Sequence, residues 1–371
     1  MKVLILTNHQ SGLYRFRREL LETLNNAGHE VYVSVPDGEF THELEAIGVR
    51  LLLDDCLDRR GKNPFKDLKL ICRYKKILNE LSPDVVLTYT IKPNVYGGWL
   101  CRKLNIPYIA NVTGLGTSIE NPGASQRFIL WLYKEGLAKA EKVFFQNRHD
   151  YCFMVEHKVV DDKTCDVLPG SGVNTEEHAY ESYPSDDDTV IFSTIGRIMK
   201  DKGIDEILDA AYRIKSVNQN VIFRLIGDFD EDYREKVESK QAEKIVEYIP
   251  FQKEIQPFIK GSHAILHASY HEGMSNVLLE AASSGRPVVA TNVPGCIETF
   301  NDGETGIAFE AKSPDSLVRA IEKFLSLSHS QKEQMGIKGR KKIISEFDRA
   351  IVVQKYIDEI NRVSEKKKTV G

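Results

Sequence analysis

The stretch Ala264-Ile-Leu-His-Ala-Ser-Tyr-His-Glu-Gly-Met-Ser-Asn-Val-Leu-Leu-Glu280 decides the fold of the second half of this chain. Its first residues form a short apolar run that is typical of a buried strand, and its last apolar residues recur at helical spacing. A glycine-containing turn joins the two parts, so the stretch predicts a strand, a loop and a helix. This order is the repeating unit of a parallel α/β sheet.

Two glutamates in this stretch predict its chemistry. Glu272 lies in the loop, and Glu280 lies in the helix that follows. Ser275 or Asn276 would cap that helix, whose first N–H groups and partial positive charge suit a phosphate. Carboxylates accept hydrogen bonds from adjacent hydroxyl groups, so the combination indicates a nucleotide sugar. For Glu280 the alternative is a helix carboxylate paired with a basic side chain.

Length and composition indicate a two-domain globular protein. A chain of 371 residues exceeds what one hydrophobic core usually supports. A net charge of −4 argues against a general nucleic-acid binder. No apolar run approaches the roughly 20 residues of a membrane span, and the first strand follows Met1 directly. The six cysteines have no metal-binding spacing, which fits reduced thiols, and we expect a cytoplasmic protein.

A basic segment covers residues 59–76, where eight Lys or Arg stand against one acid, Asp67. Apolar residues recur through the segment at roughly helical spacing. One interpretation is a helix that packs on its sheet and leaves a solvated basic face. The other is a basic amphipathic helix that lies on the inner face of the plasma membrane. The two interpretations are compatible if the helix packs on its sheet and only its basic face contacts lipid.

Apolar runs and helical patterns alternate along both halves of the chain. This alternation predicts an α/β protein with two doubly wound, Rossmann-like domains. We place the N-terminal domain at 1–170 and the second at 171–348, and we expect a final helix at 349–365 to cross back to the first domain. The expected strands lie near 3–6, 31–35, 49–53, 85–88, 108–111, 143–146 and 166–168, and then near 189–195, 221–226, 246–249, 263–267, 287–290 and 306–309.

A second motif follows the predicted strand that ends at Ile195 and reads Gly196-Arg197-Ile-Met-Lys-Asp-Lys202-Gly203. Gly196 would let a ligand approach the backbone. Arg197 and Lys202 would grip a diphosphate, the arginine bidentately and the lysine as a point charge. Alone, the motif could be an ordinary basic loop. Because ligands bind at the carboxyl ends of parallel strands, we expect this loop and the Glu272 loop to share one site.

Together these motifs resemble those of the retaining glycosyltransferases of family 4, which have the GT-B fold. The resemblance rests on Gly196-Arg197…Lys202-Gly203, on Glu272…Glu280 and on Pro287-Val-Val-Ala-Thr-Asn-Val-Pro-Gly295. It covers the C-terminal domain closely and the N-terminal domain more loosely. It is strongest toward bacterial enzymes that assemble capsular polysaccharide, exopolysaccharide or lipid-linked glycans, and it implies two Rossmann-like domains that face a central cleft.

The resemblance also implies roles for the matched residues. Arg197 and Lys202 would bind the donor diphosphate, Glu272 would hold the transferred sugar, and Glu280 would take the ribose hydroxyls. We therefore expect Arg197, Lys202 and Glu272 to be catalytic. Phe251 stands in the loop that binds the base in this family, or simply at a strand end. The donor-binding candidates are Gly12, Gly196, Phe251, Gly273, Met274, Ser275, Asn276 and Glu280.

The N-terminal domain carries weaker signals. Many family members have a histidine in the loop that corresponds to 111–116, and this chain has none, so no catalytic base is predicted there. Asp228-Phe-Asp230 resembles a metal-binding D-x-D motif, but its context between a strand and a helix predicts that Asp228 caps the helix or lies near the base. We expect neither a metal ion nor another cofactor. The acceptor-side candidates are His9, Arg17, Lys92 and Thr113.

These expectations combine into one function. The chain would be a glycosyltransferase of the hexosyltransferase type that moves a hexose or N-acetylhexosamine from a UDP-sugar, with retention, to a polyprenyl-diphosphate-linked or growing polysaccharide acceptor. A front-face route lets the leaving phosphate take the acceptor proton, which tolerates the missing histidine. Two alternatives stay open: a UDP-sugar 2-epimerase of the same fold, and a non-catalytic subunit that binds nucleotide sugars. No nucleic-acid partner is expected.

Overall fold

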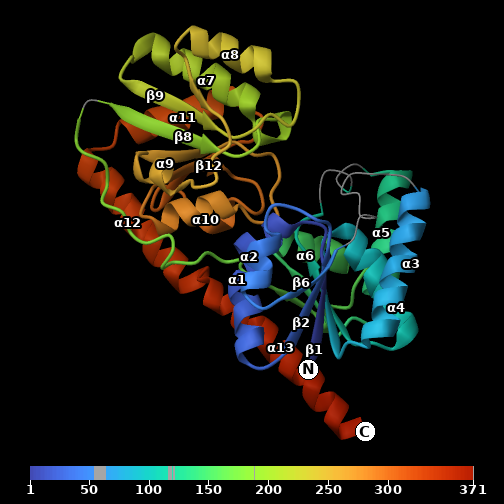
Figure 1. Cartoon of the computed structure of the whole chain (residues 1–371). Coiled ribbons are helices and arrows are strands. Elements are labelled where there is room, and N and C mark those ends of the chain that lie inside the picture. The colour runs from blue at the N-terminus through green and yellow to red at the C-terminus, as the bar shows by residue number, and fades with distance from the viewer. Residues whose placement is uncertain (54–63, 116–118, 120–121, 188, 371) are drawn as a thin grey trace. The chain divides into compact units, whose positions relative to one another are not determined.

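The computed structural model describes residues 1–371 except 54–63, 116–118, 120–121, 188 and 371 (Figure 1). Arg59, Arg60 and Lys62 of the basic segment and Gly116 lie outside the described residues. The chain forms two compact units, which we call unit 1 (Met1–Ser171 and Arg349–Gly371) and unit 2 (Gly172–Asp348). Each unit is built on one parallel sheet, so the predicted α/β fold with two Rossmann-like sheets is confirmed.

The sheet of unit 1 has the strand order β3-β2-β1-β4-β5-β6-β7. The order reverses between β1 and β4, which makes a topological switch point at the carboxyl ends of these strands. The central strands are buried on both faces, as their continuous apolar runs require. The strands are β1 (Lys2–Leu6), β2 (Glu30–Val35), β3 (Arg50–Leu53), β4 (Val85–Tyr89), β5 (Tyr108–Val112), β6 (Lys142–Phe145) and β7 (Cys165–Val167).

Helices cover both faces of this sheet (Figure 1). Helices α3, α4, α5 and α6 pack on one face through one apolar core, and α1, α2 and α13 pack on the other through a second core. A π-helical turn, η1, precedes α4. Their bounds are α1 (Gln10–Asn26), α2 (Thr41–Ala46), α3 (Pro64–Leu81), η1 (Pro93–Gly97), α4 (Gly98–Leu104), α5 (Ala124–Leu137), α6 (Arg148–Glu156), the 3₁₀ turn η3 (Asp162–Thr164) and α13 (Arg349–Val370).

The sheet of unit 2 has the strand order β10-β9-β8-β11-β12-β13. Its switch point lies between β8 and β11, which are neighbours in the sheet although two other strands separate them in the chain. The loops after β8 and β11 therefore meet at one edge. The strands are β8 (Val190–Ile195), β9 (Val221–Ile226), β10 (Glu247–Ile249), β11 (Ala264–His267), β12 (Val288–Thr291) and β13 (Gly306–Phe309).

Two further cores hold the helices of unit 2. Helices α7, α8 and α11 share one core, α9 and α10 share the other, and α12 packs on α10. Within the part of the chain that the structure describes, no helix is long and apolar enough to cross a bilayer. The bounds are η4 (Lys200–Lys202), α7 (Ile204–Val217), α8 (Arg234–Ala242), α9 (Gln256–Lys260), α10 (Asn276–Ser283), η5 (Ile297–Thr299), α11 (Pro314–Leu325) and α12 (His329–Glu346).

The last helix, α13, belongs to unit 1 and packs against α1. Arg349 fixes its start: its Nη1 lies 3.0 Å from each carboxylate oxygen of Glu19 and 2.9 Å from the carbonyl oxygen of Arg15. The Arg349 side chain is only 7% exposed. Burying a charged guanidinium this deeply costs free energy, and these acceptors offset that cost.

Arg349→Ala should destabilise unit 1, because it removes charged hydrogen bonds and leaves Glu19 without this partner. We expect the free energy of unfolding, measured by urea denaturation, to fall by roughly 2–3 kcal/mol. Arg213→Ala is the matched control, since Arg213 makes exposed pairs with Asp209 and Asp315 that should contribute little. Equal losses in the two variants would contradict the anchoring role of Arg349.

Candidate active site

Lys202 and Glu272 follow the two strands that flank the switch point of unit 2. Lys202 ends the short turn η4 after β8, and Glu272 lies in the loop after β11. Lys202 Nζ donates a hydrogen bond to Glu272 Oε1 at 2.5 Å. The side chains are 21% and 16% exposed, so the pair is shielded from most of the solvent. The structure thus brings together two residues that the sequence analysis assigned to one site.

His267, the last residue of β11, completes this cluster. Its Nε2 lies 3.0 Å from Glu272 Oε1 and 3.2 Å from Ser275 Oγ, and the residue is buried. The sequence analysis did not single out His267. The signal that could have found it is a histidine at the carboxyl end of an otherwise apolar strand, because that end of a parallel sheet is where ligands bind.

The surroundings of Glu272 set its charge. Burial by itself would raise the pKa of this carboxyl group. The positive charge of Lys202 and the hydrogen bond with His267 outweigh burial and lower the pKa well below its ordinary value of 4.5. Glu272 is therefore a carboxylate at neutral pH, able to accept hydrogen bonds from hydroxyl groups and to stabilise positive charge.

Two glycines let the loops of this cluster approach one another. Gly203 has a φ of +67°, and a Cβ atom there would lie 2.3 Å from the carbonyl oxygen of Ala268. Gly295 has a φ of +80°, and a Cβ atom there would lie 2.3 Å from the carbonyl oxygen of Glu272. Any side chain at either position would force the backbone of these loops apart.

The start of α10 differs from the prediction in one respect. Ser275 occupies the N-cap position but makes no side-chain capping hydrogen bond, because its hydroxyl faces His267 instead. The first turn of α10 therefore presents backbone N–H groups that no side chain caps. Asn276 Oδ1 is also buried without a hydrogen-bond partner. The side chain of Met274 packs in an apolar core, so only its backbone could contact a ligand.

Arg197 follows β8 and forms an ion pair with Asp230. Its side chain is 45% exposed, which leaves it accessible to a ligand. Beside it, Gly196 has open space where a side chain would point. The prediction that Asp228 caps a helix is wrong: α8 begins at Arg234 with Tyr233 at its N-cap.

Asp228 instead accepts a hydrogen bond from the backbone N–H of Phe251 at 3.4 Å. Phe251 follows β10 and is 52% exposed, so its ring is available at the same edge of the sheet. Glu280 lies one turn along α10 from Asn276 on the same helix face and is half-buried. Their contacts with a donor stay predictions.

In unit 1, the predicted acceptor-side residues His9 and Arg17 make contacts with other residues of the unit. His9 Nδ1 accepts a hydrogen bond from Gly12 N at 2.9 Å and so caps α1. Arg17 is buried, with its guanidinium 5.4 Å from the ring centre of Tyr89 and 5.7 Å from that of Tyr356. Arg17 is thus buried within unit 1, and its predicted contact with an acceptor stays a prediction.

Lys92 and Thr113 follow β4 and β5, which are neighbours in the sheet. Lys92 Nζ pairs with Asp67 Oδ1 at 2.7 Å, so a carboxylate of α3 balances its charge. Thr113 is half-buried. Both positions lie at the carboxyl edge of the sheet, where an acceptor contact was predicted, and that role stays a prediction.

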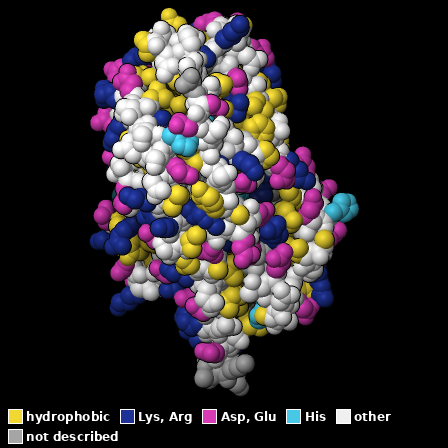
Figure 2. All heavy atoms as spheres, turned by 90° about the vertical axis from the view of Figure 1, so that its left-hand side faces the viewer, with side chains coloured by type: hydrophobic (Ala, Val, Ile, Leu, Met, Phe, Trp, Pro, Cys, Tyr) yellow, Lys and Arg dark blue, Asp and Glu magenta, His cyan; other side chains and the backbone are white. Residues whose placement is uncertain are grey.

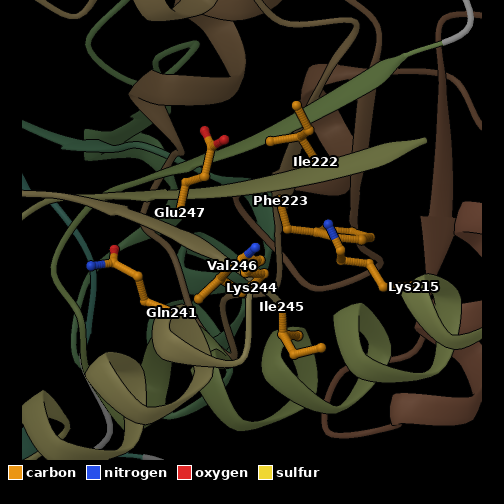
Figure 3. A pocket seen from close by; sticks show the side chains of 8 residues that line it. All are labelled: Lys215, Ile222, Phe223, Gln241, Lys244, Ile245, Val246 and Glu247. Carbon is orange, nitrogen blue, oxygen red and sulfur yellow. The ribbon is translucent and has the colours of Figure 1, made fainter. Parts of the chain in front are cut away.

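A cavity of about 410 Å³ in unit 2 lies apart from these residues (Figure 3). Its lining includes Ile222 and Phe223 at the start of β9. It also includes Glu247, the first residue of β10, and Val246, which precedes it. Since the candidate site lies at the carboxyl ends of the strands, the cavity is at the opposite edge of the sheet and contains none of the predicted site residues.

Comparisons with known proteins agree with this geometry. The family model of the group 1 glycosyltransferases matches residues 175–342, and that of the glycosyltransferase 4-like domains matches residues 2–147. The chain belongs to the family 4-like glycosyltransferases. The resemblance seen in the sequence and the expected enzyme class are confirmed.

Two curated relatives and one solved structure show how far the similarity of this glycosyltransferase extends. An N,N'-diacetylbacillosaminyl-diphospho-undecaprenol α-1,3-N-acetylgalactosaminyltransferase of Campylobacter jejuni is 25% identical over 98% of this chain and 99% of its own length. A UDP-Gal:α-D-GlcNAc-diphosphoundecaprenol α-1,3-galactosyltransferase of Escherichia coli is 22% identical over 84% of each chain. The Anabaena protein Alr3699/HepE, solved in complex with UDP, has a TM-score of 0.77 at 17% identity and covers 98% of this chain and 100% of its own. The GT-B fold is thereby confirmed.

Lys202→Met should change how the stability of the glycosyltransferase depends on pH. Because folding lowers the pKa of Glu272, its ionised carboxylate stabilises the folded state at pH values above the ordinary pKa of 4.5. This contribution is lost as the pH falls toward the pKa of Glu272 in the folded state. Without Lys202, only His267 opposes the effect of burial, so the pKa of Glu272 should be higher and the loss should begin at higher pH. Urea denaturation between about pH 3 and 7 measures the shift. Lys338→Met, which breaks an exposed pair with Glu304, is the control and should leave the profile unchanged.

His267 should act as a positioning residue for Glu272. His267→Ala should lower the turnover of the glycosyltransferase by about 10²-fold, because a displaced Glu272 carboxylate would no longer contact the transferred sugar. His267→Gln keeps a side-chain N–H and should retain most of the rate. Steady-state kinetics and thermal melting of both variants test this. Equal losses in the two variants, or a loss that follows melting temperature alone, would contradict it.

Proposed function

We propose that this glycosyltransferase transfers a sugar from a UDP-sugar to a hydroxyl group of a polyprenyl-diphosphate-linked saccharide, with retention of the anomeric configuration. The observation that carries the proposal is the cluster of Lys202, Glu272 and His267 beside the uncapped start of α10. It offers a cation and backbone N–H groups for a phosphate next to a carboxylate for sugar hydroxyls.

The donor half of the proposal uses residues of unit 2. Lys202 and Arg197 would bind the diphosphate, with Arg197 exchanging Asp230 for a phosphate oxygen. Glu272 would accept hydrogen bonds from the transferred sugar, and Glu280 from the ribose. Support for UDP comes from the E. coli relative, whose name contains UDP-Gal, and from the Anabaena structure, which contains UDP.

The acceptor half rests on the names of the two relatives, each of which contains a diphosphoundecaprenol-linked sugar. Such an acceptor is anchored in a membrane by its hydrocarbon chain. Unit 1 would meet it through the loops after β4 and β5, where Lys92 and Thr113 lie. The described part of the basic segment, residues 64–76, would hold the enzyme at an anionic lipid surface.

The chemistry follows from charge and position. The bond between the anomeric carbon and the diphosphate breaks, a bond to the acceptor oxygen forms on the same face, and the acceptor proton passes to the leaving phosphate oxygen. Lys202 and Arg197 would stabilise the negative charge on the departing diphosphate, and Glu272 the positive charge on the sugar. Because two basic side chains supply this charge, we propose that no metal ion is required.

A panel of UDP-sugars, tested with and without a polyprenyl-diphosphate-linked saccharide, checks the proposal. We expect UDP release from one donor, only with acceptor, at a rate that EDTA leaves unchanged, and a product whose anomeric configuration by NMR is that of the donor. Arg197→Ala should raise the activation barrier by about 2–4 kcal/mol. The exposed Arg213→Ala should not.

Three outcomes would overturn the proposal. Epimerisation of the donor without acceptor would make the protein a 2-epimerase. Binding of the donor with no turnover under any condition would make it a non-catalytic subunit. An inverted product would leave the glycosyltransferase assignment in place and remove the retaining mechanism.

A further inference from the structure

Exposed apolar side chains gather in one region of unit 1. Among the described residues of this unit, the large apolar side chains that are exposed lie at or just after the ends of β3 and β4 and in the helices α3 and α5. Exposure reaches 78% for Phe65 and 54% for Trp131. The set consists of Leu53, Phe65, Leu68, Ile91, Phe128 and Trp131.

The fold explains why these residues share one region. Leu53 ends β3, and Ile91 lies just before η1. Phe65 and Leu68 lie in the first two turns of α3, and Phe128 and Trp131 lie in the second and third turns of α5. Helices α3 and α5 cover the same face of the sheet and both pack against η1 (Figure 1). Because each helix follows a strand of a parallel sheet, both begin at the same edge. We call this region the α3–α5 face.

Helix α5 has an outer face that is both aromatic and basic. Arg127, Phe128, Trp131 and Lys134 recur at helical spacing and are all exposed. The rings of Phe128 and Trp131 are stacked, with their centres 5.9 Å apart. The opposite side of α5 is already buried in the core of unit 1, so the aromatic pair has no role in holding the helix to the sheet.

Helix α3 presents a similar outer face. Phe65 and Leu68 begin it, and the basic residues Lys69 and Lys76 continue it toward the carboxyl end. The acidic residue Asp67 pairs with Lys92, which lies outside α3. The face is therefore apolar at its start and basic in its middle, and near its carboxyl end Lys76 pairs with Glu80. In contrast, basic and acidic side chains are interspersed over much of the face of the molecule that Figure 2 shows.

We propose that the α3–α5 face inserts its aromatic and aliphatic side chains into the interfacial layer of an anionic bilayer. Aromatic side chains flanked by Lys and Arg match a surface whose headgroups are negative and whose interior is apolar. A second copy of the chain fits less well, because its basic residues would meet those of the first copy. The proposal deepens the proposed function by adding insertion through α5 to electrostatic contact through α3.

Flotation of the whole protein with vesicles tests the proposal, without donor or acceptor. Binding is expected to vesicles that contain phosphatidylglycerol and to be weaker with phosphatidylcholine alone. The double variant Phe128→Ser and Trp131→Ser should bind at least about tenfold more weakly. The matched control, Tyr212→Ser with Val217→Ser, removes two exposed apolar side chains of unit 2 and should bind normally.

Fluorescence tests insertion itself. The chain has two tryptophans, so Trp99→Phe leaves Trp131 as the reporter. On addition of anionic vesicles, its emission should shift to the blue and be quenched by brominated lipid. Unchanged emission with salt-sensitive flotation would mean electrostatic contact alone and overturn the proposal. So would normal flotation of the double variant, or self-association that this variant abolishes.

The two proposals fail separately. Vesicle binding is measured with no sugar present, so it does not depend on the transfer reaction. A protein that inserts Trp131 but transfers no sugar would overturn the proposed function and leave the membrane surface intact. A protein that transfers sugar to a water-soluble acceptor analogue but never binds vesicles would do the reverse.

Discussion

The candidate site depends on the ion pair of Lys202 and Glu272, which lie half-buried side by side at the ends of β8 and β11. Either charge alone would be costly to remove from water, and together they compensate one another. Their contact requires that the loops after two strands, distant in the chain, lie within hydrogen-bond distance. The reversal of strand order between β8 and β11 makes this possible.

The rest of the site follows from that contact. Gly203 and Gly295 leave room for the loop backbones, and His267 takes up a position on the same carboxylate oxygen as Lys202. Ser275 turns its hydroxyl toward His267 and so leaves the start of α10 without a side-chain cap. The site is thus already charged and ordered before a ligand arrives, which is what electrostatic catalysis requires.

Sequence alone predicted most of the fold, because a buried parallel strand is a short continuous apolar run bounded by turn residues. It missed α2, which is six residues long and buries one side chain, Leu44. In such a short element a tertiary contact outweighs the local pattern.

For the candidate site, the sequence predicted some residues and missed others. Lys202 and Glu272 lie in motifs with fixed spacing, and the structure brings them together. His267 was not predicted, because a single histidine in a strand belongs to no motif with a fixed residue spacing. Arg17 was predicted only as an acceptor-side candidate, and the fold shows that it is buried with Tyr89 and Tyr356 around it.

The position of α13 has a consequence for how the protein is made. Its residues Tyr356 and Ile360 share a core with Val3, Ile5 and Phe144, from the start and middle of the chain. A ribosome completes the whole of unit 2 before it reaches α13. Throughout that interval the first sheet lacks part of its apolar cover, which exposes it to aggregation. Unit 1 therefore becomes fully folded only after the whole of unit 2 has been made.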